Sequence, residues 1–445
     1  MEHASRRTIE RTIRTSVFAM LTVAAICSTS SVAVAGLSGP APMDEQQPLQ
    51  LPGGVSVYPT LPFQLGEVDL TTIGVSDNEL LDVGPGGGTP VTTSGDAGLL
   101  IVDDDLLDCP NATFTSIQAA VTAALPGETI KVCRGTYMEQ VTIPPGKDGL
   151  TLFSEGALQA VIKAPLIMTD PKAIVRINGA QNVTLRHFTI SGPGGSGCDS
   201  IRWGVRVDGA GSATITHNHI TEIHDTPFSG CQNGIGVNVG RNSEQQTGFA
   251  IVDHNLIDKY QKGGVFVDGR LASAVERSQA TVAYNEIVGI GPNPIIAQNG
   301  IQISRNAVAD VHHNKVSQNV YIAPTGLPEA DATGILIFTQ PAGGVIVHHN
   351  DVFLNEDGVF LFTTQATEVS YNRARNNLLD GIYAGPDTSE NSIRYNNSRD
   401  NQEHDCHDDS TGTHNMPAAV ANEWEKDLGN TENKPGLCKH ATVTP

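Results

Sequence analysis

The sequence has 445 residues, a formal net charge of −21, 46 glycines and 25 prolines. So acidic a chain is poorly suited to nucleic acid or to anionic membrane surfaces as partners. Beyond the N-terminal segment, no stretch approaches the ~20 consecutive apolar residues that cross a bilayer, so we expect no membrane insertion. Composition leaves the oligomeric state open.

The first 35 residues are typical of a secretory signal peptide. Four arginines precede an apolar run from Val17 to Ile26, and Ala33-Val34-Ala35 forms an A-x-A cleavage site before Gly36. We therefore predict an exported protein, secreted or periplasmic, whose mature chain begins near Gly36.

Residues 36–107 are rich in proline, glycine and acidic residues and show no sustained period, which indicates a linker or loosely attached arm. A short helix is predicted next, before the stop signal Pro126-Gly127. Its apolar residues recur at helical spacing: Ile117, Ala120, Val121 and Ala124. We expect this helix to cap the open end of a stack of strands, because an uncovered edge would leave backbone groups unpaired.

A repeat then runs through the chain at intervals of 22 to 37 residues. Asparagine marks each repeat and stands three residues after Val or Ile, at Asn218, Asn255, Asn285, Asn314, Asn350, Asn372 and Asn396. A glycine leads an apolar strand in each repeat, at Gly204, Gly234, Gly264, Gly300, Gly334, Gly358 and Gly381. Periods of this length predict a solenoid with three strands per coil and a stacked column of asparagines.

The helix followed by "PGETIKVCRGTYMEQVTI" resembles the opening coil of the pectin-lyase-like right-handed parallel β-helix superfamily, and the later repeats resemble its repeat modules. The resemblance covers roughly Phe114 to Cys438. It implies an all-β fold of about nine coils over residues 108–400, followed by a C-terminal cap and tail over 401–445. We carry over no catalytic residue from the family.

Six cysteines remain after the signal segment, an even number in an oxidising compartment. They allow fifteen pairings. Guided by the coil register, we predict three local bridges: Cys109–Cys133, Cys198–Cys231 and Cys406–Cys438.

Insertions gather on the two turns that flank the glycine-led strand, which predicts two walls of loops beside one flat sheet. Alternation places the second and fourth residues after each glycine on the outer face of that sheet. We predict that a polysaccharide binds along this groove through Arg206, Asn238, Phe266, Phe338, Phe360, Phe362 and Tyr383. An arm or tail that covers the aromatic half is the alternative. An acidic glycan would need a locally basic groove or a bridging cation, so we expect no resident cofactor and leave calcium open.

Asp208 and Asp268 stand two coils apart, roughly 9.6 Å from the strand spacing, and could serve as acid and base on a glycosidic bond. Arg206 or Arg270 could instead balance a uronate while a base removes a proton. His224, in a wall loop, is the candidate base. The alternative for both aspartates is that they are turn residues ending their strands, and for His224 that it is solvated.

Histidine pairs give a metal alternative. His312 and His348 occupy one repeat position in adjacent coils, as do His313 and His349, so their imidazoles could share an ion. Rows of like side chains are also common in solenoids. The functional prediction is therefore a polysaccharide-binding β-helix that is a lyase, epimerase or glycosidase if it is an enzyme. The alternatives are a non-catalytic carbohydrate-binding or structural protein and a periplasmic metal-handling protein.

Overall fold

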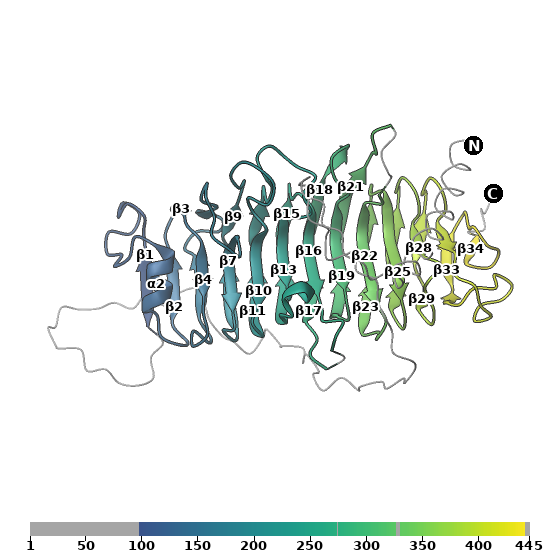
Figure 1. Ribbon diagram of the computed structural model, residues 1–445, viewed down its shortest axis with the longest axis horizontal. Helices are drawn as coiled ribbons and strands as arrows, with labels where there is room; N and C mark the ends of the chain where they lie inside the picture. The colour runs from purple at the N-terminus through teal and green to yellow at the C-terminus, as the bar shows by residue number, and fades with distance from the viewer. Residues whose placement is uncertain (1–97, 274, 326–329, 441–445) are drawn as a thin grey trace, which may run out of the picture. The chain divides into compact units, whose positions relative to one another are not determined.

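The computed structural model describes residues 98–273, 275–325 and 330–440. The predicted signal peptide and residues 36–97 of the predicted arm lie outside this part of the chain. Short strands follow one another through it with tight turns and loops, and each strand pairs in parallel with the equivalent strand of the next coil (Figure 1). Three all-parallel sheets result, which we call sheets A, B and C.

Sheet A has twelve strands: β1 (Leu99–Val102), β2 (Thr129–Val132), β5 (Thr151–Ser154), β8 (Val183–Arg186), β11 (Gly211–Thr216), β14 (Gly248–Asp253), β17 (Gln279–Ala283), β20 (Val308–His312), β23 (Val345–His348), β26 (Glu368–Ser370), β29 (Ser392–Arg394) and β32 (Glu423–Glu425). Sheet B also has twelve: β3 (Gly135–Met138), β6 (Ala160–Lys163), β9 (Thr189–Ser191), β12 (His219–Thr221), β15 (Leu256–Asp258), β18 (Glu286–Asn293), β21 (Lys315–Tyr321), β24 (Asp351–Phe353), β27 (Arg373–Arg375), β30 (Asn397–Arg399), β33 (Asp427–Gly429) and β34 (Cys438–His440). Sheet C has ten: β4 (Val141–Ile143), β7 (Ala173–Asn178), β10 (Trp203–Asp208), β13 (Ile235–Val239), β16 (Gly263–Asp268), β19 (Asn299–Ser304), β22 (Thr333–Gln340), β25 (Asp357–Thr364), β28 (Ile382–Ala384) and β31 (Cys406–Asp408).

The chain visits sheets A, B and C in turn, so each coil contributes three strands. Val, Ile and Leu side chains from all three sheets point inward and form one continuous core along the stack. Burying these residues between coils is the main stabilising term, because an isolated coil could not remove its apolar face from water. The predicted right-handed parallel β-helix is confirmed.

The capping helix is confirmed as α2 (Ile117–Ala123), which lies between β1 and β2 in the chain. Ser116 caps its N-terminus by accepting a hydrogen bond from the backbone N–H of Ala119, and the helix buries Ile117, Ala120 and Val121 against the first coils. A 3-10 turn, η3 (Asn242–Glu244), lies in the loop after β13.

The asparagine column lies at the turn between sheets A and B. The side-chain amide of Asn314, for example, donates to Asn350 Oδ1 at 3.0 Å and to the Val282 carbonyl at 2.7 Å, while its own Oδ1 accepts from Asn285. These bonds pair buried polar groups that would otherwise be costly. A second column, which the sequence analysis did not find, lies farther along sheet B: Asn319, Asn355, Asn377 and Asn401.

The ends of the solenoid lie farther out than the sequence suggested. The first strand, β1, begins at Leu99, within the segment assigned to the arm, and pairs with β2 over its whole length. Coils also continue past residue 400, through β31 to β34. Ten to twelve strands per sheet therefore replace the expected nine coils. The terminal coils lack the glycine and asparagine markers, which is why the repeat count missed them.

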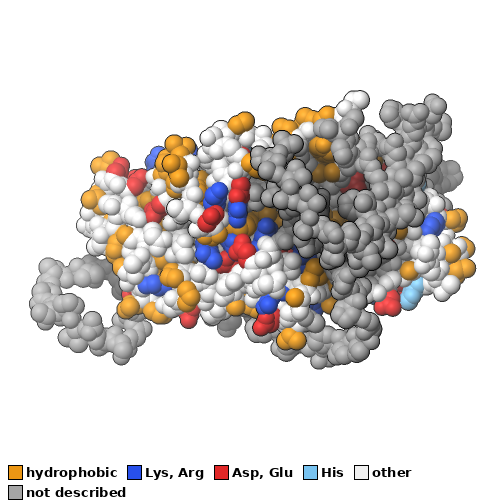
Figure 2. All heavy atoms as spheres, viewed as in Figure 1, with side chains coloured by type: hydrophobic (Ala, Val, Ile, Leu, Met, Phe, Trp, Pro, Cys, Tyr) orange, Lys and Arg blue, Asp and Glu red, His pale blue; other side chains and the backbone are white. Residues whose placement is uncertain are grey.

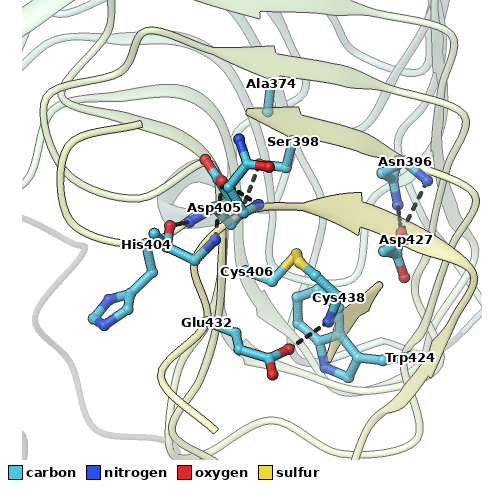
Figure 3. Close-up of a disulfide and its surroundings, with 12 residues drawn as sticks. Ala374, Asn396, Ser398, His404, Asp405, Cys406, Trp424, Asp427, Glu432 and Cys438 are labelled. Carbon is cyan, nitrogen blue, oxygen red and sulfur yellow. Dashed lines mark hydrogen bonds between the residues drawn. A yellow bond between two sulfur atoms is a disulfide. The ribbon is translucent and has the colours of Figure 1, made fainter. Parts of the chain in front are cut away.

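All three predicted disulfides are confirmed: Cys109–Cys133, Cys198–Cys231 and Cys406–Cys438. The third joins β31 to β34 beside Trp424 in the last coil (Figure 3). Among the described residues, no helix is both long and apolar enough to cross a membrane.

Candidate functional site

The outer face of sheet C carries three rows of side chains that run across the coils. The first row follows the register of Trp203, Ile235, Gly263, Asn299 and Thr333. The second row follows the register of Arg176, Arg206, Asn238, Phe266, Gln302, Leu336, Phe360, Tyr383 and His407. All the predicted groove residues except Phe338 and Phe362 lie in the second row. Those two lie two residues farther along their strands, in a third row that follows the register of Asp268, Ser304, Phe338 and Phe362.

The N-terminal half of this face holds a charged cluster, which we call the arginine–aspartate cluster: Arg176, Arg206, Asp208 and Glu244. Asp208 is fully buried and accepts hydrogen bonds from Arg176 Nε at 3.0 Å and Nη2 at 2.9 Å. Arg206 Nε lies 2.6 Å from the same carboxylate, and its other nitrogens pair with Glu244. The carboxylate of Asp208 is therefore already paired with the guanidinium groups of two arginines.

Burial opposes ionisation of Glu244, but the hydrogen bond and charge of Arg206 outweigh it and lower the pKa of this carboxyl. Arg202 lies nearby, and its hydrogen bond to Asp199 raises the pKa of the guanidinium. Figure 2 shows these basic and acidic side chains gathered on one face over β7 and β10. Four arginines gather in this region, Arg176, Arg202, Arg206 and Arg241. The carboxylates of Asp199, Asp208 and Glu244 pair with the first three, so the region is close to balanced in charge.

Trp203 lies beside this cluster on the outer face of β10, a position that the sequence pattern did not predict. Simple alternation would turn it inward together with Val205. The strand is irregular at Gly204, however. A Cβ on Gly204 would point into the core, 2.9 Å from Ile220 Cγ2, and Val205 also lies in the core, so two consecutive residues face inward. Trp203 consequently lies on the outer face, packed against Phe266, with the Arg206 guanidinium 4.2 Å from its ring centroid.

Asp268 lies two coils beyond Asp208 at the end of β16. Its Oδ1 accepts from Ser304 Oγ at 3.0 Å and from Arg305 Nη1 at 3.1 Å, and its Oδ2 accepts from the backbone N–H of Asn242 at 2.8 Å. The Arg305 guanidinium also lies 5.6 Å from the centroid of the Phe338 ring. No sequence pattern marked Arg305, since it follows its strand at a left-handed turn position with φ +54°.

Several buried polar atoms on this face have no hydrogen-bond partner within the described residues. In the first row these are Trp203 Nε1, Asn299 Oδ1 and Thr333 Oγ1, and beside them lie Asn238 Oδ1 and Arg305 Nη2. Leaving such groups without partners costs free energy. This face thus contains both donors and acceptors that are buried and unpartnered within the described residues.

Arg270 and His224 lie in the loops beside the sheet. Arg270, in the turn after β16, pairs with Glu276 and donates to Gln245 Oε1 at 3.3 Å. His224 lies in the loop after β12, with its Nδ1 2.8 Å from the Asp225 carbonyl oxygen and its ring against Phe228. Within the described part of the chain, their contacts are with their own walls and not with Asp208 or Asp268.

Aromatic rings occupy the C-terminal half, as predicted. Phe338 stacks on Phe362 with centroids 5.3 Å apart, and Phe360 stacks on Tyr383 at 4.5 Å. Each ring therefore shares a face with its neighbour in the next coil. That arrangement leaves less ring face for a sugar than a row of separate platforms would.

A network of buried, hydrogen-bonded side chains lies at the C-terminal end of this half of sheet C. His407 lies 2.7 Å from Asp380 through Nδ1 and 3.1 Å from Asp409 through Nε2, and the Tyr383 hydroxyl donates to Asp409 at 3.0 Å. Burial disfavours the His407 cation, but Asp380 and Asp409 outweigh it and raise the pKa of His407 to about 10. Ligand atoms of Asp380, His404 and His407 lie within 4.8 Å of one another, as in a metal site. Both ring nitrogens of His407 have carboxylate partners, so an ion bound there would have to displace a proton and one of these contacts.

No protein-family model and no curated protein matches the sequence. The fold is similar to that of the GH136 lacto-N-biosidase from Eubacterium ramulus, with a TM-score of 0.52 and 15% identity over 77% of this chain and 66% of that one. This chain thus covers slightly less than two thirds of that enzyme. Alginate lyase from Paenibacillus sp. str. FPU-7 matches at a TM-score of 0.41 and 15% identity over 69% of this chain and 94% of the lyase. At 15% identity the likeness to the lacto-N-biosidase shows the fold alone, a parallel β-helix.

Proposed function

We propose that this protein binds a polysaccharide along the outer face of sheet C, and that the sugar carries carboxylates. The observation that carries the proposal is the row of buried, unpartnered donors and acceptors at Trp203, Asn238, Asn299 and Thr333. Sugar hydroxyls both donate and accept, so a chain lying across the coils could pair with each of these atoms once the side chains that cover them move aside.

The charge on this face favours a uronate over a neutral sugar. Arg305 directs one nitrogen to Asp268 and has no partner for Nη2 among the described residues. A guanidinium can bind a carboxylate through two parallel hydrogen bonds. The arginine–aspartate cluster adds Arg176 and Arg206 toward β7, where each guanidinium is already paired with a carboxylate of the protein. Similarity in fold to a lacto-N-biosidase supports a carbohydrate ligand in general.

The contacts of the two aspartates favour binding over hydrolysis. An inverting glycosidase needs one carboxyl group that gives a proton to the leaving oxygen and another that activates water. Asp208 is surrounded by Arg176 and Arg206, and Asp268 is held by Ser304, Arg305 and a backbone N–H. Neither carboxylate is free for proton transfer, so we assign both to positioning the arginines. The three disulfides favour a secreted or periplasmic protein, where such a ligand would be met.

Binding is tested with a panel of uronate and neutral polysaccharides in affinity gels and calorimetry, together with assays for new double bonds and reducing ends. We expect binding to a uronate polymer without either product. Arg305→Gln should weaken it at least tenfold, and Trp203→Phe, which keeps an aromatic side chain but removes the indole N–H, should weaken it several-fold.

Arg373→Gln, an exposed arginine on sheet B, is the matched control and should bind normally. Raising the salt concentration should weaken the wild-type complex by screening its charges. Equal affinities for Arg305→Gln and wild type, or failure of every uronate polymer to bind, would refute the proposal.

A further inference from the structure

A column of rings lies at the opposite side of each coil, where the chain turns from sheet A to sheet B. The residue before each ladder asparagine is aromatic or histidine and adopts a positive φ. Neighbouring rings in this column stack from coil to coil with centroids 4.8 to 5.2 Å apart, through His217, His254, Tyr284, His313, His349, Tyr371 and Tyr395. This column shares no residue with the sheet C groove.

In two adjacent coils, a second histidine stands directly before the column histidine. His348 ends β23, and the left-handed turn at His349, φ +54°, brings the two imidazoles together at an interplanar angle of 85°. Their Nδ1 atoms lie 2.8 Å apart. One coil earlier, His312 and His313 repeat this arrangement with their Nδ1 atoms 3.0 Å apart.

Two ring nitrogens at this distance match two neighbouring ligands of one metal ion. With metal–nitrogen bonds of about 2.0 Å, ligands at right angles stand roughly 2.8 Å apart, whereas tetrahedral ligands stand roughly 3.3 Å apart. Right-angled nitrogen ligands are typical of square-planar or tetragonal Cu²⁺ and Ni²⁺, and Cu²⁺ binds such sites most tightly.

Asp310 orients the first imidazole of the pair. Its Oδ1 lies 3.0 Å from His348 Nε2, so the carboxylate accepts that N–H and leaves His348 Nδ1 unprotonated. In the metal-free pair this Nδ1 accepts a hydrogen bond from His349 Nδ1, and a bound ion would take the place of that proton. A carboxylate on the far nitrogen is the usual arrangement behind a metal-binding histidine.

We propose that His348 and His349 bind a divalent copper ion through their Nδ1 atoms, with Asp310 as the positioning residue behind His348. The site is partly open to solvent, since His349 is exposed and His348 half-buried. Within the described residues, no carboxylate bonds to Nε2 of His312, so its pair with His313 is the weaker site. Two doubly charged ions about 5 Å apart would also repel, which lowers the second affinity by roughly two orders of magnitude.

The test is calorimetry of the full chain, purified without a histidine tag, with Cu²⁺ and with Zn²⁺ in a non-coordinating buffer. We expect one strong Cu²⁺ equivalent, Zn²⁺ at least tenfold weaker, and nitrogen hyperfine splitting from imidazole in the electron paramagnetic resonance spectrum. His348→Gln and His349→Gln should each weaken Cu²⁺ binding at least tenfold. Asp310→Asn should weaken it by about tenfold.

His217→Gln is the matched control, because His217 occupies the same ring column but is preceded by Thr216, whose Oγ1 lies 2.7 Å from its Nδ1. It should bind Cu²⁺ like the wild type. Unchanged affinity in the double variant His348→Gln/His349→Gln would overturn the proposal, as would an equal loss in His217→Gln. Thermal unfolding of each variant identifies any loss that comes from misfolding. Glycan binding should be unaffected by all of these changes.

Discussion

Asp427 occupies the position of a ladder asparagine in the last turn between sheets A and B. Its Oδ1 accepts two hydrogen bonds of 2.9 Å, from the backbone N–H and the side-chain amide of Asn396 (Figure 3). Its Oδ2 is buried and has no partner within the described residues. Burial therefore raises the pKa of this carboxyl to about 7. The carboxyl group of Asp427 therefore holds a proton more readily than an exposed aspartate does. In that state it is neutral, like the asparagine side chains elsewhere in the column.

Because the pKa is raised on folding, the native state binds this proton more tightly than the unfolded chain does. The stabilisation is fully present below pH 3.8 and is lost as the pH rises through about 7. Asp427→Asn should remove this loss, so we expect a gain of about 1–3 kcal/mol in unfolding free energy at pH 8 and almost none near pH 4. Denaturant unfolding at both values checks this, and a gain independent of pH would contradict it.

At the scale of one element, close packing requires the glycine near the start of the central sheet C strands. A Cβ at Gly334, in β22, would lie 2.8 Å from the Gly358 carbonyl oxygen and 2.8 Å from Asn355 Nδ2. The first is sheet backbone and the second belongs to the second asparagine column, so neither moves cheaply. The glycine column of the sequence thus marks where the strand lies against the next coil and the core.

Gly334→Ala should therefore destabilise the protein by about 1–3 kcal/mol, since an overpacked site must shift backbone or side chains. Gly230→Ala is the control: Gly230 is exposed in a loop, and the nearest atom to its added Cβ would be 3.4 Å away. Unfolding in urea measures both. Equal midpoints for Gly334→Ala and wild type would show that the coil spacing adapts.

At the scale of the whole solenoid, the two terminal coils are the weak points, because each has a neighbour on one side only. A disulfide lies at each end of the described coils: Cys109–Cys133 in the first and Cys406–Cys438 in the last. The remaining bridge, Cys198–Cys231, joins two successive loops between sheets B and C and stiffens that wall.

Replacing Cys406 and Cys438 by alanine should let the last coil open locally. We expect the free energy of opening for amides of residues 402–440 to fall by about 2–4 kcal/mol in hydrogen exchange, while the central coils keep their protection. The pair Cys198→Ala/Cys231→Ala should leave those C-terminal amides unchanged. A uniform loss of protection over all coils would instead indicate one cooperative unit.

The sequence by itself determined the repeat, because a period-two strand pattern and the asparagine and glycine markers are local signals that each coil restates. The sequence also predicted which strands carry the outward-facing row of polar and aromatic side chains, the disulfide pairing and the capping helix. It could not show the second asparagine column or the terminal coils, where the markers are absent.

Only the tertiary structure decided which charges meet. Arg176, Asp208 and Glu244 are separated by more than thirty residues in sequence yet meet because coils stack one strand apart. Trp203 faces outward only because the strand is irregular at Gly204, and Arg305 reaches Asp268 from the next coil. Such contacts depend on coil stacking and local irregularity, which the residue order within one repeat does not encode.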